Sequence, residues 1–223
     1  MLEALGKRFP DGRLTVDPNG AWSLEEVVRL LTPLRPVLAY AEDPVSAEGD
    51  YSSREVMAEF RRRTMIPIAT DMVATDWRQL GHAWQLQAVD IPLADVHCWT
   101  MTGSVQVAEL CAAWGYRWGL HSNNHFNVSL AMSVQAALAA PGDINPIDTH
   151  WIWQEGEHLT IARPQIVDGF IANPDLPGLG IELDGAAHAL YRQDHITTRD
   201  DAAQMRHLIP GWCFDPRRPA MAR

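Results

Sequence analysis

Carboxylate and imidazole side chains recur at regular intervals along this chain, and they could carry out metal-assisted acid–base chemistry. Successive members of the set are separated by 24 to 29 residues: Asp17, Glu42, Asp71, Asp95, His121 and His150. One acidic residue after an apolar stretch is most often a helix cap or a loop partner. A whole set at one interval predicts instead a shared site.

The first members of the set suit a divalent cation. Asp17, Glu42 and Asp71 offer the hard oxygen ligands that Mg²⁺ takes from proteins, together with substrate and water. Glu48 follows Glu42 on the next loop and is an alternative for the middle ligand. The sequence therefore predicts a Mg²⁺ site whose middle ligand is open between Glu42 and Glu48.

His121 is the member of the set that can move a proton near neutral pH. If Asp95 accepts the imidazole N–H, it selects the tautomer of His121 and raises its basicity. A base beside a divalent cation is equipped to remove a proton next to a carboxylate, because the cation stabilises the negative charge that develops.

Each of these polar residues ends a short apolar stretch that precedes a segment of helical period. Residues 14–16 precede Asp17, and Ser23 has the features of an N-cap for a helix over 27–34. Further helices are expected over 53–64, 76–86, 103–114 and 126–140. The last strand of the set is expected over 145–149, ending in His150. Alternation of strands and helices at this pitch is typical of a parallel sheet with right-handed crossovers.

The carboxyl ends of parallel strands are where α/β proteins bind their ligands. All the residues of the set can converge there only if the sheet closes on itself. We therefore predict a (β/α)₈ TIM-type barrel. An open doubly wound sheet is the alternative, and it would spread these strand ends along a line.

Composition favours a globular domain and argues against several partners. Of the 223 residues, 47% are apolar and 21% are charged, which is enough for one sizeable core. The formal net charge of −10 opposes binding to nucleic acid and to an acidic membrane surface. Widely spaced cysteines favour reduced thiols, and the N-terminus lacks a signal-peptide pattern. We expect a cytoplasmic protein.

Several motifs closely resemble the glucarate dehydratases, in the mandelate racemase-like branch of the enolase superfamily. They are Asp17-Pro18-Asn19-Gly20-Ala21-Trp22, Ala41-Glu42-Asp43-Pro44, Ala74-Thr75-Asp76-Trp77-Arg78-Gln79, Val89-Asp90-Ile91-Pro92-Leu93-Ala94-Asp95, His121-Ser122-Asn123-Asn124-His125-Phe126, Asp148-Thr149-His150-Trp151-Ile152-Trp153-Gln154 and Ile209-Pro210-Gly211-Trp212. The resemblance covers nearly the whole chain. It implies Mg²⁺-assisted removal of the proton α to a carboxylate of an aldarate such as D-glucarate or L-idarate. Loss of the β-hydroxyl then converts D-glucarate to 5-keto-4-deoxy-D-glucarate.

The resemblance also assigns the metal ligands. Asp17 and Asp71 take the first and third positions, and the middle position falls on Glu48 or Glu42, with a slight preference for Glu48. The family usually has Asn where this chain has Asp71. A carboxylate there makes the site more negative, which should tighten Mg²⁺ and weaken a dianionic substrate.

The same comparison of motifs implies the catalytic and substrate-binding residues. His121 and Asp95 form a dyad that acts as base on one epimer and as acid on the leaving hydroxyl. Arg199 suits a substrate carboxylate, because its planar guanidinium can bind both oxygens. The implied substrate contacts are Asn19, Ser122, Asn123, His150 and Arg199.

Part of the family's catalytic machinery is expected outside this sequence. In the family, a Lys-x-Lys pair on the second barrel strand supplies the opposing base, whereas Lys7 is the only lysine here. We therefore expect barrel strands three to eight over residues 1–154. Residues 155–223 are expected to form the last barrel helix and a segment that, in the family, packs toward a capping domain.

A barrel without its first strands would expose two sheet edges, which predicts a homo-oligomer, aggregation or pairing with a complementing N-terminal half. The isolated chain is expected to be inactive. The favoured interpretation is a fragment of an active dehydratase. The alternatives are half of a split enzyme and a non-catalytic remnant that binds Mg²⁺ or an acid sugar.

Overall fold

The computed structural model describes residues 1–122, 126–142, 144–154, 158–173 and 176–189. These residues fall into two units, which are described separately. Unit 1 comprises Met1–His121 with Ala136–Asp148, and unit 2 comprises Ser122–Gln135 with the described residues from Thr149 onward.

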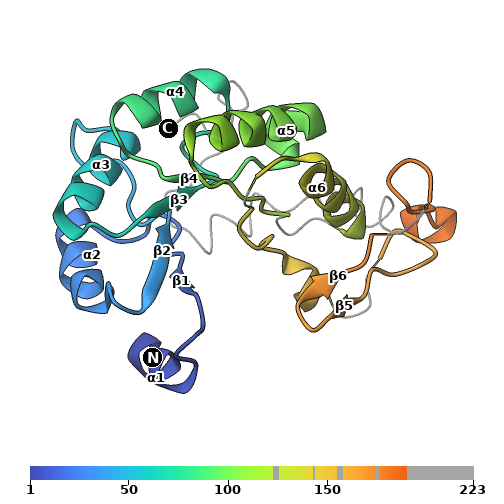
Figure 1. Cartoon of the computed structure of the whole chain (residues 1–223), viewed down its shortest axis with the longest axis horizontal. Helices are drawn as coiled ribbons and strands as arrows, with labels where there is room; N and C mark the ends of the chain where they lie inside the picture. The colour runs from blue at the N-terminus through green and yellow to red at the C-terminus, as the bar shows by residue number, and fades with distance from the viewer. Residues whose placement is uncertain (123–125, 143, 155–157, 174–175, 190–223) are drawn as a thin grey trace. The chain divides into compact units, whose positions relative to one another are not determined.

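Strands and helices alternate through unit 1, as Figure 1 shows from the blue N-terminus to the green segments. Its elements are α1 (Leu2–Arg8), β1 (Leu14–Val16), α2 (Leu24–Leu31), η1 (Thr32–Leu34), β2 (Leu38–Glu42), α3 (Ser53–Thr64), β3 (Ile68–Thr70), α4 (Trp77–Gln85), β4 (Ile91–Pro92) and α5 (Val96–Trp114).

The strands of unit 1 are parallel and follow one another in chain order, β1-β2-β3-β4. Parallel bridges extend this order through Leu93 with Gly119, Trp118 with Ile144, and His121 with Asp148. A doubly wound sheet would reverse its strand order at a switch point. Chain order without reversal is that of a (β/α) barrel, here incomplete, as predicted from the sequence.

The two faces of the sheet have different neighbours. Ala41 and Ile68 belong to the main core beneath α2 and α3, together with the fully buried Phe60. Tyr40 and Ala69, one residue away on the same strands, pack in a separate small cluster on the other face. Because strand side chains alternate, this second face also receives residues two positions further along. Glu42 and Asp71 have that phase.

Local capping interactions explain where the helices begin. The Ser23 side chain accepts from the Glu26 N–H at the start of α2. Ser52 and Glu55 form a capping box at α3, and Asp76 accepts two N–H groups at α4. Each cap falls on the polar residue just before the apolar period, which is why these starts were predictable.

The helix predicted over 103–114 begins earlier than expected. Asp95 caps α5, which starts at Val96 and contains a break at Thr100 (φ 62°, ψ 165°). The helix predicted over 103–114 therefore corresponds to the second helical segment, after the break, and the first segment was not predicted. The Thr100 hydroxyl accepts from the Gly103 N–H at 3.3 Å, at the start of the second segment.

The last predicted strand also ends earlier than expected. Asp148, not His150, stands opposite His121 in the parallel bridge. His150 instead begins the 3₁₀ helix η2 (His150–Trp153), which Thr149 caps by accepting from the Trp151 N–H. The hydroxyl of Thr149 thus ends the extended segment before His150.

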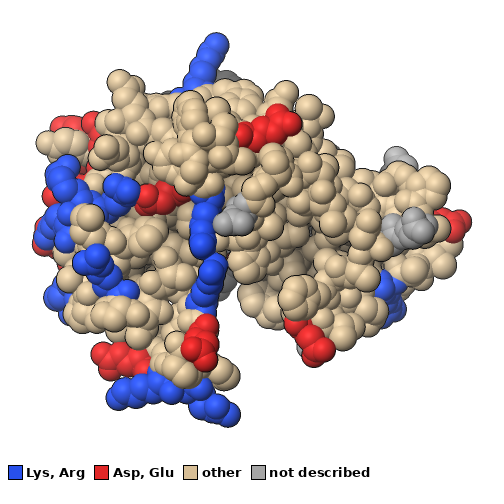
Figure 2. All heavy atoms as spheres, in the orientation of Figure 1, with Lys and Arg blue, Asp and Glu red and all other residues tan. Residues whose placement is uncertain are grey.

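Charges over α2 and α3 are mixed in sign, as the left side of Figure 2 shows. Arg61 forms a bidentate pair with Asp90, and its closest N–O distance is 2.6 Å. Arg63 pairs with Glu25 on the neighbouring helix. These arginines are therefore already engaged with carboxylates.

Unit 2 contains η2, most of α6 (Asn127–Ala139) and the antiparallel pair β5 (Ile166–Val167) and β6 (Phe170–Ile171). The buried Asn127 side chain accepts from the Leu159 N–H at 3.0 Å and donates to the Thr160 hydroxyl.

The predicted division of the chain at residue 154 stays a prediction. Within the described residues, every helix is too short or too polar to cross a membrane. Cys98 and Cys111 are free thiols.

Candidate active site

Polar residues of unit 1 gather at the carboxyl ends of its strands. Asp17 follows β1, Glu42 ends β2, and Asp71 follows β3. His121 lies in the bridge with Asp148. Glu42, Asp71 and His121 each present one metal-binding atom, and these atoms all lie within 4.8 Å of one another. We call Asp17, Glu42, Asp71, His121 and Asp148 the strand-end cluster.

His121 is buried between two carboxylates of this cluster. Its Nδ1 lies 3.7 Å from Asp71 Oδ2, and its Nε2 lies 3.6 Å from Asp148 Oδ2. Only 6% of His121 is exposed, whereas 49% of the Asp148 side chain is exposed. Both distances exceed those of direct hydrogen bonds, and they leave the ring close enough to both acids for strong charge coupling. The His121 ring thus lies within ion-pair distance of both acids.

Burial raises the pKa values of three carboxylates in the cluster, Asp17, Glu42 and Asp71. Burial raises the pKa of Glu42 to about 9, and the charges of Asp17, Asp71, Asp43 and Asp148 add to the effect. Burial is also the main cause of the raised pKa values of Asp17 and Asp71. Carboxylates that repel one another in this way are ordinarily relieved by a proton or by a cation.

The other candidate for the middle metal ligand lies on the loop between β2 and α3. One carboxylate oxygen of Glu48 accepts from the Leu24 N–H at 2.6 Å, at the beginning of α2. Backbone hydrogen bonds between Glu48 and Tyr51 close a turn in the same loop. Glu42 thus lies within the strand-end cluster, while Glu48 holds the N-terminus of α2.

Asp95 is buried, follows β4 and contacts His97. Its Oδ1 accepts from the His97 backbone N–H at 2.9 Å and lies 2.5 Å from His97 Nδ1. Asp95 is 3% exposed. The dyad of Asp95 with His121 stays a prediction.

The expected substrate contacts that the structure describes belong to both units. Asn19 has a positive φ of 51°, and its side chain donates to Asp17 Oδ2 at 2.7 Å. In unit 2, the buried Ser122 donates to the Thr149 hydroxyl at 2.7 Å, and the His150 ring packs on Trp153. Asn123 and Arg199 lie outside the described residues, as does the motif at 209–212.

Two acidic residues of this region were missed by the sequence analysis. Asp43 is 2% exposed and accepts hydrogen bonds from the residues around Asp71. Asp148 lies beside His121. Both stand in motifs that were recognised, immediately after Glu42 and two residues before His150. Their adjacency to predicted site residues was the available signal.

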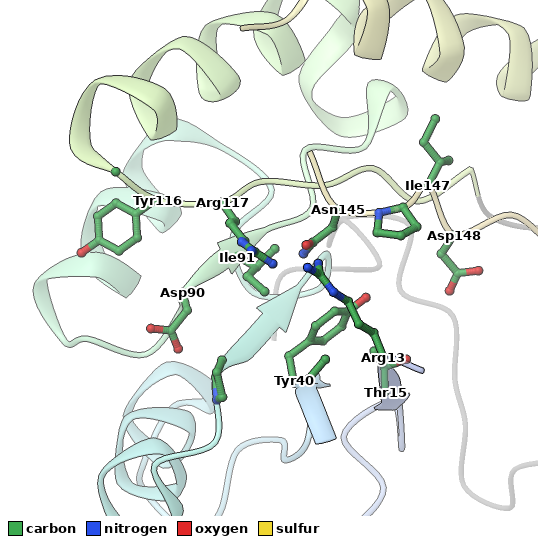
Figure 3. A pocket seen from close by; sticks show the side chains of 14 residues that line it. Arg13, Thr15, Tyr40, Asp90, Ile91, Tyr116, Arg117, Asn145, Ile147 and Asp148 are labelled. Atoms are coloured by element: carbon green, nitrogen blue, oxygen red, sulfur yellow. The ribbon is translucent and has the colours of Figure 1, made fainter. Parts of the chain in front are cut away.

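A cavity of about 820 Å³ extends along unit 1 and reaches Asp148. Figure 3 shows the side chains of Arg13 and Arg117 directed toward Asn145, with Tyr40 beside Arg13. Burial raises the pKa of Tyr40 to about 12, with Glu42 and Asp148 contributing, so its phenol stays protonated. The arginines give this cavity the positive charge that the strand-end cluster lacks.

Residues 1–187 match the family described as "Enolase C-terminal domain-like". A protein of Streptomyces coelicolor named "Probable glucarate dehydratase" is 35% identical over 218 residues, which are 95% of this chain and 49% of that protein. The chain thus spans about half the length of this relative.

Two solved structures match this chain at a similar identity and over a similar share of their own length. An enolase from Pseudomonas fluorescens with bound magnesium, potassium and tartrate is 36% identical, with a TM-score of 0.83 over 97% of this chain and 51% of its own. An enolase from Thermobispora bispora complexed with magnesium and formate is 35% identical, with a TM-score of 0.81 over 95% of this chain and 50% of its own.

Proposed function

Because the chain belongs to the enolase C-terminal domain-like family, we propose that it is the metal- and imidazole-bearing half of a Mg²⁺-dependent acid-sugar dehydratase. The observation that carries this proposal is the convergence of Glu42, Asp71 and His121, whose metal-binding atoms all lie within 4.8 Å of one another. We further propose a hydro-lyase reaction of the glucarate dehydratase type, with D-glucarate or L-idarate as substrate.

The donor set fits Mg²⁺ better than a softer metal. Asp17 and Asp71 would supply hard oxygen ligands, and either Glu42 or Glu48 would supply the middle one. The raised pKa values of Asp17, Glu42 and Asp71 fit the same view, because a bound divalent cation would stabilise the charged carboxylates that burial and neighbouring charges disfavour. When bound, Mg²⁺ would stabilise negative charge on the substrate carboxylate.

The residues of the chain would then handle the protons. His121 would take the proton from the carbon α to the carboxylate of one epimer, or give a proton to the departing β-hydroxyl of the other. The C–H and C–O bonds break, water leaves, and the enol that remains tautomerises to the keto acid. Asp71 and Asp148 flank the His121 ring, at 3.7 Å from Nδ1 and 3.6 Å from Nε2.

The size and charge of the bound ligand in a relative support the substrate class. Tartrate, which is bound in the Pseudomonas fluorescens enolase, is a dicarboxylate that carries hydroxyls on the carbons next to its carboxylates. Aldarates share that pattern on a longer chain. The first test therefore uses D-glucarate, L-idarate and tartrate with Mg²⁺.

The experiment joins this chain to the N-terminal half of the Streptomyces coelicolor relative and measures formation of keto acid. We expect the fusion to be active and the 223-residue chain alone to be inactive. His121→Ala in the fusion should lower kcat by about 10²- to 10⁴-fold, the usual effect of losing a general acid or base. His82→Ala, on the exposed side of α4, is the matched control.

A folded fusion that binds Mg²⁺ and dehydrates none of these substrates would contradict the dehydratase proposal. A specific observation then favours a second function: Lys7, on α1, is the only lysine in the chain, so an opposing lysine base of the family type must come from elsewhere. Binding of Mg²⁺ and an acid sugar without turnover would be that function.

Comparing Glu42→Gln with Glu48→Gln decides the middle ligand. Loss of one carboxylate ligand weakens a site of this kind, so the variant that raises the Mg²⁺ dissociation constant in calorimetry identifies the ligand. The other variant serves as its control.

A further inference from the structure

Asp43 is a buried carboxylate that the proposed chemistry does not use. It directly follows Glu42 at the end of β2, is 2% exposed and has a positive φ of 34°. Burying a carboxylate is costly unless hydrogen bonds replace its water. A left-handed backbone is also unfavourable for a residue other than glycine. The contacts of Asp43 must offset both costs.

The side chain of Asp43 holds the turn that presents Asp71. Its Oδ1 accepts from the Thr70 hydroxyl at 2.5 Å, and its Oδ2 accepts from the N–H groups of Asp71 at 3.2 Å and Met72 at 3.4 Å. The Thr70 hydroxyl in turn accepts from the N–H groups of Met72 and Val73. The turn after β3 is therefore tied to β2 through one carboxylate.

The backbone of Asp43 holds the turn that follows Asp17. Its carbonyl accepts from the Gly20 N–H at 2.7 Å, while its own N–H donates to the Ala69 carbonyl at 3.0 Å. Gly20 itself has a φ of 68°, and an added Cβ would come within 3.1 Å of Ser46 Cβ. The loops that carry Asp17 and Asp71 therefore meet at this one residue.

We infer that Asp43 is a positioning residue that sets the separation of the Asp17 and Asp71 carboxylates and so prepares the Mg²⁺ site. The inference rests on the proposed function, because it takes Asp17 and Asp71 as metal ligands. Asp43 acts through hydrogen bonds to the backbone of those loops. Partners of this kind typically contribute about 10- to 100-fold to metal affinity.

Variants at Thr70 separate positioning from charge. Thr70→Val removes the hydroxyl that donates a hydrogen bond to Asp43 and leaves the charge of the site unchanged. Thr70→Ser keeps this hydroxyl. We expect Thr70→Val to raise the Mg²⁺ dissociation constant by about tenfold or more, and Thr70→Ser to stay near the parent value. Asp43→Asn should also weaken binding, because an amide cannot accept from all three donors in this arrangement.

The experiment measures Mg²⁺ binding by calorimetry, the free energy of unfolding without Mg²⁺, and amide hydrogen exchange at Asp71 and Met72. Weaker binding together with faster exchange at these two amides supports positioning. Unchanged Mg²⁺ affinity in folded Asp43→Asn and Thr70→Val overturns the inference, even if both are less stable.

If a variant is too unstable for calorimetry, hydrogen exchange at the two amides still tests the inference. This exchange can be compared between Thr70→Ser and Thr70→Val at low temperature. Equal exchange in these two variants overturns the inference. A parent chain that binds no Mg²⁺ would overturn the proposed metal site itself, and the inference with it.

Discussion

At the scale of single residues, the strand-end cluster brings buried acids around one imidazole. Glu42 is 5% exposed, and the nearest candidates for the metal site, Asp17 and Asp71, raise its pKa further after burial itself. Without a cation, a proton is the simplest way to relieve this repulsion. The protonation of Glu42 should therefore be coupled both to folding and to Mg²⁺ binding.

The pKa of Glu42 predicts a pH dependence of stability. It is about 9 in the folded chain, against about 4.3 for an unperturbed glutamate. Between these values the folded state keeps a proton that the unfolded state has lost. The free energy of unfolding without Mg²⁺ should therefore fall as pH rises, with a slope approaching about 1.4 kcal/mol per pH unit from this residue.

Glu42→Gln should remove this contribution, so that its urea-unfolding free energy in EDTA depends less on pH between pH 5 and about 9. Glu48→Gln changes the same functional group outside the strand-end cluster and should keep the slope of the parent chain. Parallel pH profiles for the parent and Glu42→Gln would refute the assignment.

At the scale of elements, the position of His121 depends on close packing between neighbouring strand segments. Gly119 bridges Leu93 in the parallel ladder, and an added Cβ at Gly119 would lie 2.7 Å from Leu93 Cδ2. Leu93 is 3% exposed, so its side chain has little room to move. A glycine lets the segment carrying His121 approach β4.

Gly119→Ala should therefore destabilise the chain by about 1–3 kcal/mol through overpacking. Gly81→Ala is the matched control, because no atom lies within 4 Å of an added Cβ there and the site is on the exposed side of α4. Because Gly81 lies within a helix, Gly81→Ala should raise the free energy of unfolding by about 0.5–1 kcal/mol. Urea unfolding measures both, and equal effects of the two substitutions would disprove the packing argument.

At the scale of the whole molecule, the chain spans about half of each relative with which it was compared. The described parallel segments follow each other without closing a ring, and unit 1 holds a cavity of about 820 Å³. Cation binding at the strand-end cluster would join β1, β2 and β3 through their ends. Mg²⁺ should therefore act on the stability of unit 1 as a whole.

Mg²⁺ at about 100 times its dissociation constant should raise the free energy of unfolding by about 2.7 kcal/mol. For a chain of this size, that corresponds to an increase in Tm of roughly 5–10 °C. Thermal unfolding with and without Mg²⁺ measures the effect. Asp71→Ala should abolish it, and Asp11→Ala, at an exposed position, should leave it intact. An equal increase in Asp71→Ala would show that Mg²⁺ binds elsewhere.

Much of the fold could be predicted because its signals are local. Ser23, Ser52 and Asp76 cap helices, and each is the polar residue just before a stretch in which apolar residues recur at helical spacing. Repetition of strand and helix in one direction indicated a parallel sheet, and the order of the strands agrees with the barrel. The first segment of α5, between its cap Asp95 and the break at Thr100, was not predicted.

The sequence by itself determined the strand–helix alternation, the family and the phase that sends Glu42 and Asp71 to one face of the sheet. Only the tertiary structure decided the partners of these residues. Strand alternation would send Asp43 to the face opposite Glu42, yet its positive φ turns it toward Thr70 and Asp71. The placement of Asp148 beside His121 likewise depends on how neighbouring strands are aligned. Such contacts join loops far apart in the chain, so register and packing set them, and no local pattern encodes either.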